Sequence, residues 1–394
     1  MRLYLWAPLG GEMKVAARLD WDRDVGSVRY APSWLEAPDA YALDPMNLPL
    51  GDEDRLIEQN RGIPGVLSDA GPDRWGRRLM ERLSSRPPRN EAEWVLATAG
   101  AGTGAIRASL SRSALPPVQP VYPQVTLEQI EEASRQVAEG GFPPPPMYEI
   151  LCVQSGALGG ARPKAAMLID GRQVIAKFQQ PQQDTVDVPR LEAACLSLAK
   201  RAGIDAVEAS VTSAHGRSVL LVDRFDRRGV VPLHYLSARS LLAVYRASEL
   251  DTVSPGGRAT YAAIAAAARR MGIEGAGAEL FRRMAFNYAI GNTDDHLQNH
   301  GFLYDEGWRL APAFDIVAIG GESLAIGAGR QGRARTRENL LSGAGDFGLR
   351  ASEADAILEQ AITAARGLGN ELDRLAMPAG ERAQVLRHQC DEAR

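Results

Sequence analysis

The sequence predicts an α+β fold, in which a β-rich amino-terminal part is followed by a mostly helical carboxy-terminal part. Residues 1–30 alternate apolar and polar side chains, as the strands of a small antiparallel sheet do. Two later segments, GARPKAAMLIDGRQVIAKFQ and ASVTSAHGRSVLLVDRFDR, each contain two strand-like runs, which indicates two hairpins. After about residue 237 the apolar positions follow helical spacing. Strands and helices that are segregated along a chain are typical of the α+β class.

Composition and periodicity predict three helices and one linker in the first half of the chain. GPDRWGRRLMERLSS and EAEWVLATAG predict two helices, and TLEQIEEASRQVAEGG predicts a third with a threonine cap and a glycine stop. SRSALPPVQPVYP is proline-rich, which indicates a linker. We therefore expect an amino-terminal β-rich subdomain over residues 1–110, a linker with a helix over 111–147, a β-rich part with a glycine-rich loop over 148–236, and a helical part over 237–394.

The overall charge argues against a chain that binds nucleic acid through its net charge. The 394 residues carry a formal net charge of -4. One local exception is the segment 329–339, which is rich in arginine. This segment indicates either a solvated loop or a surface for an anionic partner.

The three cysteines, Cys152, Cys195 and Cys390, lack the spacing of metal ligands, and their odd number fits a reducing cytosol. The start of the chain has no basic region followed by an apolar one, so no signal peptide is expected. Nowhere do about 18 uncharged apolar residues follow one another, so no membrane span is expected. These features predict a cytoplasmic protein.

The first candidate for a functional site is the glycine-rich loop QSGALGGARPK, residues 154–164. Its three glycines let backbone N–H groups approach an anion, and Lys164 adds positive charge. An ordinary turn is the alternative interpretation. The loop does not match the Walker pattern, which requires Gly-Lys-Ser/Thr at the start of a helix.

Lys177 stands at the end of the apolar run QVIAKF. A lysine at the edge of a strand often extends to water, which is the simpler interpretation. The alternative is a lysine that binds phosphates and pairs with a carboxylate on the next helix, where Glu192 is available. A lysine on a strand paired with a glutamate on a helix is the arrangement that protein kinases use beside the nucleotide.

The stretch NYAIGNTDDHLQNHGFLYD places many polar side chains between apolar runs. Asp294 and Asn299 have the spacing of a kinase catalytic loop, in which the aspartate accepts the proton of the substrate hydroxyl and the asparagine holds magnesium. Asp315, after the apolar run LAPAF, stands where a kinase has its second metal-binding aspartate. Together these residues would supply one base and two oxygen ligands for magnesium.

Two alternatives compete for this stretch. NTDDH could be a capped helix start, and His296 and His300 could share one helix face and bind zinc, although no glutamate lies between them and no third ligand is evident. The order of glycine loop, lysine, helix glutamate, aspartate with asparagine, and final aspartate favours a kinase.

Several motifs resemble those of one family, the HipA-type serine/threonine kinases, which are toxins of bacterial toxin–antitoxin pairs. VRYAPSWL, NLPL and LSDAGPDRWGRRLM resemble the amino-terminal subdomain of that family. SGALGGARPKAAML resembles its phosphate loop, VDRFDR its hinge, and GNTDDHLQNHGFL and LAPAFDIV its catalytic and metal-binding loops. The resemblance covers nearly the whole chain.

This resemblance implies a HipA-like, protein-kinase-like fold of two lobes with a helical C-lobe, and ATP and magnesium as cofactors. It implies a protein serine or threonine as the acceptor, in a translation component such as an aminoacyl-tRNA synthetase. The implied partner is a DNA-binding, HipB-like antitoxin, with DNA bound only through the complex. The alternatives are a catalytically weak co-repressor that acts with the antitoxin and a small-molecule phosphotransferase.

The resemblance also assigns roles to residues. Asp294 would be the catalytic base, and Asn299 and Asp315 would hold magnesium. The residues that would bind the nucleotide or support its site are Gly159, Gly160, Ala161, Arg162, Pro163, Lys164, Lys177, Glu192, Asp223, Phe225, His296, Asn299 and Asp315. Two departures stand out: Gln298 replaces the basic residue that often precedes the metal-binding asparagine, and Ala157 replaces the autophosphorylated serine of the loop.

Overall fold

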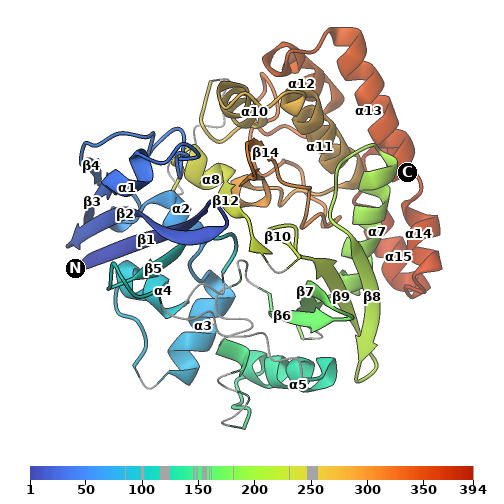
Figure 1. Cartoon of the computed structure of the whole chain (residues 1–394). Coiled ribbons are helices and arrows are strands. Elements are labelled where there is room, and N and C mark those ends of the chain that lie inside the picture. Colours follow the sequence, from blue (N-terminus) through green and yellow to red (C-terminus); the bar gives the residue numbers. More distant parts are fainter. Residues whose placement is uncertain are drawn as a thin grey trace. The chain divides into compact units, whose positions relative to one another are not determined.

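The chain divides into two compact units in a computed structural model. Figure 1 labels its helices and strands. The structure describes all residues except 85, 99–101, 116–124, 145–146, 148–149, 153–157, 159, 161, 181, 230, 246–255 and 394. The first unit comprises Met1–Gln180, Arg224–Tyr245 and Leu303–Gly307, and the second comprises Pro181–Asp223, Arg246–Phe302 and Trp308–Arg394.

The first unit begins with a five-stranded antiparallel sheet of order β4-β3-β2-β1-β5. Its strands are β1 (Arg2–Leu9), β2 (Glu12–Asp22), β3 (Val25–Tyr30), β4 (Arg55–Ile57) and β5 (Arg107–Ser109). Side chains of β1 alternate between buried and partly exposed positions, with Leu3, Leu5 and Ala7 in the core. This alternation confirms the sheet that was predicted for residues 1–30.

The helices of the first unit begin at recognisable caps. Asp73 caps α3, Asn90 caps α4, and Thr126 forms a capping box with Gln129 at the start of α5. These three helices were predicted from the sequence. The helical segments of this unit are α1 (Pro32–Leu35), the 3₁₀ turn Asn60–Gly62, α2 (Gly65–Asp69), α3 (Arg74–Leu83), α4 (Glu91–Ala97), α5 (Leu127–Ala138) and α8 (Ala238–Leu241).

A hairpin in the first unit joins β6 (Lys164–Ile169) to β7 (Arg172–Phe178) through Asp170 and Gly171, both with positive φ. The register places Lys164 directly opposite Lys177. The remaining strands are β10 (Arg227–Arg228), β11 (Val231–Pro232), β12 (His234–Ser237) and β13 (Gly301–Tyr304), whose end belongs to this unit.

The second unit opens with α7 (Val188–Arg201), which packs on the hairpin of β8 (Ala209–Ala214) and β9 (Arg217–Asp223). Both hairpins therefore form where the sequence predicted them. The helices that follow are α10 (Tyr261–Arg270), α11 (Ala276–Ile290), α12 (Arg337–Ser342), α13 (Ala351–Ala365), α14 (Leu368–Arg374) and α15 (Ala379–Leu386). Shorter elements are β14 (Trp308–Leu310) and the 3₁₀ turns Leu297–Asn299, Ala344–Phe347 and Asp391–Ala393.

Helix α11 is the central element of the second unit, because it contacts α7, α10 and α13. Its last eight residues, from Arg283 to Ile290, are all buried. The helix ends at Gly291, which adopts the left-handed conformation with φ of 85°. The α-helical backbone therefore ends at the residue that opens the candidate catalytic loop. None of the described helices is both long and apolar enough to cross a bilayer.

Candidate active site

The candidate residues fall into two groups, one in each unit. The first unit contains Gly160, Arg162, Pro163, Lys164, Lys177 and Phe225, and the second contains Glu192, Asp223, Asp294, His296, Asn299 and Asp315. Gly159 and Ala161 lie outside the described residues, as does Ala157.

The candidate catalytic loop is anchored on the end of α11 by a chain of side-chain amides. Asn287 accepts a hydrogen bond from Asn292 Nδ2 at 3.0 Å, and Asn292 Oδ1 accepts from the Asp294 amide at 3.3 Å. Asn287 and Asn292 are buried. The helix core thus fixes the backbone of Asp294.

A second anchor is the carboxylate of Asp295, which is buried among three donors. Its Oδ2 accepts from Asn287 Nδ2 at 2.5 Å, from His300 Nε2 at 3.0 Å and from the hydroxyl of Tyr261 on α10. Burial raises the pKa of this carboxyl, but His300 and the Tyr261 hydroxyl outweigh burial and hold the pKa below its usual range. Asp295 was not among the candidate residues from the sequence. The excess of polar residues between apolar runs was the pattern that could have indicated a buried polar residue here.

Asp294 and Asn299 are brought together by the local backbone. Asn299 Nδ2 donates to the Asp294 carbonyl at 3.1 Å, and the amide of His296 donates to the same carbonyl at 2.8 Å. Only the three-residue 3₁₀ turn Leu297–Asn299 follows, so NTDDH does not start an α-helix. With no α-helix here, His296 and His300 do not share a helix face, and His300 is already bonded to Asp295.

Asp315 adopts a left-handed conformation, with φ of 58°. An aspartate tolerates this region at a cost, and strained residues of this kind cluster at functional sites. The segment is held on both sides: Ala313 pairs with the backbone of 205–207, and the Ala318 carbonyl accepts from His388 Nδ1 at 2.8 Å. The surrounding structure therefore fixes the backbone around Asp315.

Two hydrogen bonds tie the start of the catalytic loop to the segment that follows Asp315. Thr293 Oγ1 donates to the Gly320 carbonyl at 2.6 Å, and the Gly320 amide donates to the Gly291 carbonyl at 2.9 Å. The loops that carry Asp294 and Asp315 are thus neighbours within the second unit.

The donor set of this unit fits magnesium. The amide nitrogen of Asn299 is bonded to the Asp294 carbonyl, so Oδ1 is the atom that Asn299 can offer as a ligand. Asp315 adds a carboxylate, and magnesium prefers oxygen ligands of these two kinds. Among the described residues, neither His296 nor His300 belongs to a cluster of three or more His, Cys, Asp or Glu that could hold a metal.

Glu192 lies buried on α7, one turn before Cys195. Burial raises the pKa of the Cys195 thiol, and contact with the backbone of Ala318 partly offsets this effect. This contact places the Glu192 helix beside the segment that follows Asp315. The expected partner of Glu192, Lys177, belongs to the first unit.

In the first unit the described part of the glycine-rich loop rests on the start of α3. The Gly160 amide donates to Asp73 Oδ2 at 2.9 Å, and the Gly160 carbonyl accepts from the Trp75 amide at 3.2 Å. Lys164 and Lys177 face each other across the hairpin. Like charges directly opposite on a hairpin repel, and a polyphosphate is an anion that would match such a pair.

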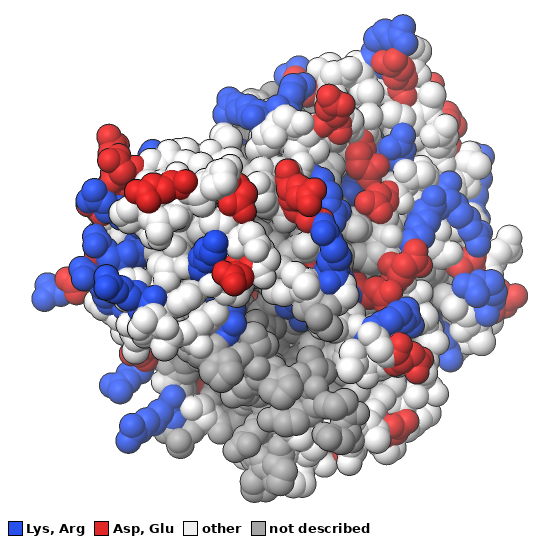
Figure 2. Space-filling view, in the orientation of Figure 1, with Lys and Arg blue, Asp and Glu red and all other residues white. Residues whose placement is uncertain are grey.

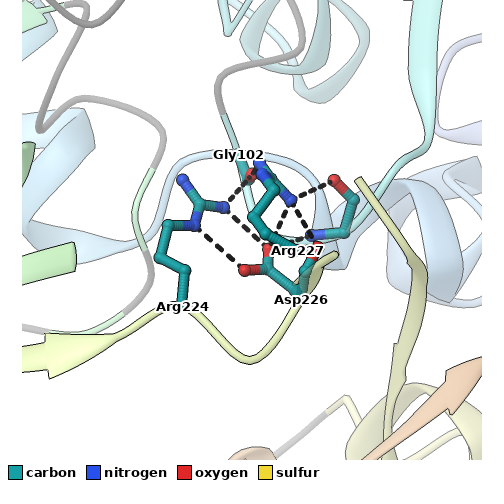
Figure 3. Close-up of polar contacts among 5 residues, drawn as sticks. Gly102, Arg224, Asp226 and Arg227 are labelled. Carbon is teal, nitrogen blue, oxygen red and sulfur yellow. Dashed lines mark hydrogen bonds and ion pairs between the residues drawn. The ribbon is translucent and has the colours of Figure 1, made fainter. Parts of the chain in front are cut away.

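The expected hinge, VDRFDR, is organised by a buried ion cluster (Figure 3). Asp226 accepts from Arg224 at 2.9 and 2.7 Å, from Arg227 at 2.8 Å and from the Gly104 amide at 2.7 Å. Burial raises the pKa of Asp226, but the two guanidinium groups outweigh it and bring the pKa to about 2. Phe225 lies between Arg224 and Asp226 in the sequence, and its ring centroid is 5.8 Å from that of Tyr235. Figure 3 shows that both arginines also reach toward Gly102.

Two family models match the chain. The model described as HipA N-terminal domain matches residues 11–109, and the model described as HipA-like C-terminal domain matches residues 156–367. The chain belongs to the HipA family. The family predicted from the sequence motifs is therefore confirmed.

Two curated relatives of this HipA-family chain come from Sinorhizobium fredii (strain NBRC 101917 / NGR234). Putative kinase Y4mE is 30% identical over 193 residues, which cover 44% of this chain and 45% of the relative. Putative kinase Y4dM is 29% identical over 167 residues, which cover 37% of this chain and 38% of the relative. The chain thus spans less than half the length of either relative.

A solved structure confirms the fold. The complex of HipA with HipB and operator DNA from Shewanella oneidensis MR-1 contains a chain that matches 98% of this one, with a TM-score of 0.66 and 17% identity. The match covers 96% of that chain. The predicted α+β, HipA-like fold is therefore confirmed.

Proposed function

We propose that this HipA-family chain is an ATP-dependent protein serine/threonine kinase and the toxin of a toxin–antitoxin pair. The observation that carries the proposal is the joined pair of loops in the second unit. Thr293 and Gly320 tie the loop of Asp294 and Asn299 to the segment of Asp315. A base and two oxygen ligands in neighbouring loops are the parts that phosphoryl transfer by kinases requires.

In this proposal Asp294 accepts the proton of the substrate hydroxyl as the hydroxyl oxygen attacks the γ-phosphorus. The bond from the γ-phosphorus to the β–γ bridging oxygen breaks, and ADP leaves. Asn299 and Asp315 would hold magnesium, which would supply positive charge at the phosphate. Lys164 and Lys177 bind phosphate oxygens. The residues act mainly by positioning and by electrostatics, since the transition state of phosphoryl transfer is loose.

The proposed partner is a small DNA-binding, HipB-like antitoxin, with DNA bound only through the complex. The similar HipA of Shewanella oneidensis was solved with HipB and operator DNA, which supports this part of the proposal. The proposed acceptor is a serine or threonine in a translation component such as an aminoacyl-tRNA synthetase. The assignment of the acceptor rests on family resemblance.

The test is quantitative phosphoproteomics after brief expression, with Asp294→Asn as the inactive variant and Asp52→Asn, an exposed residue, as the matched control. We expect phosphopeptides that appear with the unchanged chain and with Asp52→Asn and that are absent with Asp294→Asn. Purified protein with labelled ATP and the identified acceptor then reproduces the transfer. Equal phosphorylation by Asp294→Asn would show that Asp294 is not the base.

The co-repressor alternative has one observation in its favour, because Gln298 removes a positive charge beside the metal-binding asparagine. In that case the chain binds its antitoxin and operator, and no phosphopeptide depends on Asp294. Phosphorylation of metabolites without protein acceptors would instead indicate a small-molecule phosphotransferase.

A further inference from the structure

Gly160 in the glycine-rich loop is held at both of its polar backbone groups by the first turn of α3. Asp73 is the cap of that helix, and its two carboxylate oxygens have separate partners. Oδ1 accepts from the Arg74 amide at 2.8 Å, whereas Oδ2 accepts from the Gly160 amide at 2.9 Å. The Trp75 amide completes the contact by donating to the Gly160 carbonyl at 3.2 Å.

The start of α3 is a firm support for this contact. Trp75 is fully buried, and Arg77 donates to the Pro72 carbonyl at 3.2 Å. Arg77 also forms a bidentate pair with Glu91, with distances of 2.9 and 2.5 Å. Because both sides of the helix start are fixed, Asp73 presents its second oxygen at a defined position.

The backbone conformation at position 160 favours glycine. Gly160 has a φ of 97°, and a Cβ atom at this position would lie 2.3 Å from Nζ of Lys164. The Lys164 ammonium group therefore lies against the Gly160 backbone. A positive side chain beside a backbone N–H is the chemistry of an anion site.

The anion at the Gly160 amide in this structure is the carboxylate of Asp73. A backbone amide has a single hydrogen to donate. A phosphate oxygen could accept it only after the carboxylate has left, and the two anions would also repel each other.

We propose that Asp73 is a positioning residue of the nucleotide site, which holds the Gly160 amide on α3 without nucleotide and releases it to a phosphate oxygen of ATP or ADP. The inference rests on the proposed function of the loop. The amino-terminal subdomain then influences nucleotide affinity, because only molecules in which the Gly160 amide is released from Asp73 bind fully.

The test compares two cap variants of the full-length chain. Asp73→Ser keeps a good helix cap but has no second carboxylate oxygen. Asn90→Ser is the matched control, because Asn90 caps α4 by accepting from the Glu93 amide at 2.9 Å and has no hydrogen bond to the described part of the loop. The probe is ADP with magnesium, measured by titration calorimetry. Hydrogen–deuterium exchange of the Gly160 amide without nucleotide is the second readout.

Loss of one charged hydrogen-bond competitor predicts that Asp73→Ser lowers the Kd for ADP about fivefold to tenfold. The same variant speeds exchange at Gly160, and Asn90→Ser changes neither quantity. Asp73→Asn keeps the cap through Oδ1 but turns an NH2 group, which is a donor, toward the Gly160 amide, so it shifts both readouts in the same direction. This second variant keeps the test valid if Asp73→Ser folds poorly.

Three results would overturn the inference. Unchanged exchange at Gly160 would show that Asp73 does not hold the amide. Faster exchange with an unchanged or higher Kd would show that the contact does not compete with phosphate, and would leave the proposed function intact. Absence of ADP binding in every variant, including the unchanged chain, would instead remove the proposed function and the inference that depends on it.

Discussion

The carboxylate of Asp295 accepts a hydrogen bond from His300 at 3.0 Å, and both side chains are buried within the loop that carries Asp294. Tyr261 and Asn287 donate to the same carboxylate from two different helices. A buried network of this kind is stable only while every member has its partner. Asp295 therefore joins the geometry of the candidate base to the helical core.

Asp295→Ala should destabilise the second unit, because three buried donors lose their acceptor at once. The expected loss in the free energy of unfolding is about 3 kcal/mol. Urea denaturation followed by circular dichroism measures it. Asp52→Ala, at an exposed position, is the control and should change stability by less than about 0.5 kcal/mol. Equal midpoints for the two variants would contradict a role for the Asp295 network.

Asp226→Asn should also destabilise the chain, in this case the first unit. The change leaves the buried guanidinium groups of Arg224 and Arg227 without a compensating charge, which costs about 3 to 5 kcal/mol. Denaturant titration at pH 7 measures the loss.

The same carboxylate predicts a dependence on pH. The pKa of Asp226 lies at about 2 in the folded chain, below the value of about 3.9 of an unfolded aspartate. A depressed pKa stabilises the folded state above the unfolded value, and this contribution is lost as the pH falls through the folded value. The difference in the free energy of unfolding between the unchanged chain and Asp226→Asn should thus stay constant from pH 7 to about pH 5 and become smaller below about pH 4. If this difference already became smaller between pH 7 and pH 5, ionisation of Asp226 would be excluded as the cause of the pH dependence.

Asp294→Asn and Asp315→Asn should separate catalysis from binding. The base acts on the acceptor, so Asp294→Asn should abolish phosphoryl transfer and leave the Kd for ATP nearly unchanged. Asp315→Asn removes a charge from the proposed magnesium site and should weaken binding of ATP only when magnesium is present. Calorimetry with and without magnesium measures the Kd for ATP of each variant, and a transfer assay measures its rate of phosphoryl transfer. Transfer at the unchanged rate by Asp294→Asn would contradict the assignment of the base.

Local elements were predictable because their signals are local. The Asp170-Gly171 turn marks the first hairpin, and Thr126 with Gln129 marks the start of α5. Asp294, Asn299 and Asp315 could be named as candidates because their spacing is itself a pattern. Their roles as base and magnesium ligands stay predictions.

The supporting contacts were not predictable, because their partners are far apart in the chain. Asp295 is bonded to Tyr261, 34 residues earlier, and Gly160 to Asp73, 87 residues earlier. No spacing rule connects such positions, since tertiary packing alone brings them together. The Gly160 amide, for which the sequence predicts a phosphate contact, donates to Asp73 in this structure.

The sequence of the arginine-rich segment 329–339 predicts either a solvated loop or a surface for an anionic partner. In the structure, its arginines differ in their contacts and exposure. Arg335 donates to the carbonyls of Tyr288 and His388, at 2.9 and 2.7 Å, and is therefore structural. Arg337 pairs with Asp355 and Glu392, both at 2.6 Å. Arg330 and Arg333 are exposed, and Arg330 also pairs with Asp346 at 3.2 Å. Positive and negative side chains are interspersed over the described part of the face that Figure 2 shows.

The salt dependence of operator binding by the proposed toxin–antitoxin complex tests these two exposed arginines. Each phosphate contact contributes about 0.9 to the slope of log affinity against log salt, so Arg330→Ala with Arg333→Ala should lower the slope by up to about 2. Arg86→Ala with Arg89→Ala, two exposed arginines of the first unit, removes the same charge and should leave the slope unchanged. Fluorescence anisotropy across a salt series measures both. Arg335 is kept intact, because its loss would unfold the local structure. An equal slope for the two double variants would identify the segment as a solvated loop, since neither pair of arginines would then contribute phosphate contacts of its own.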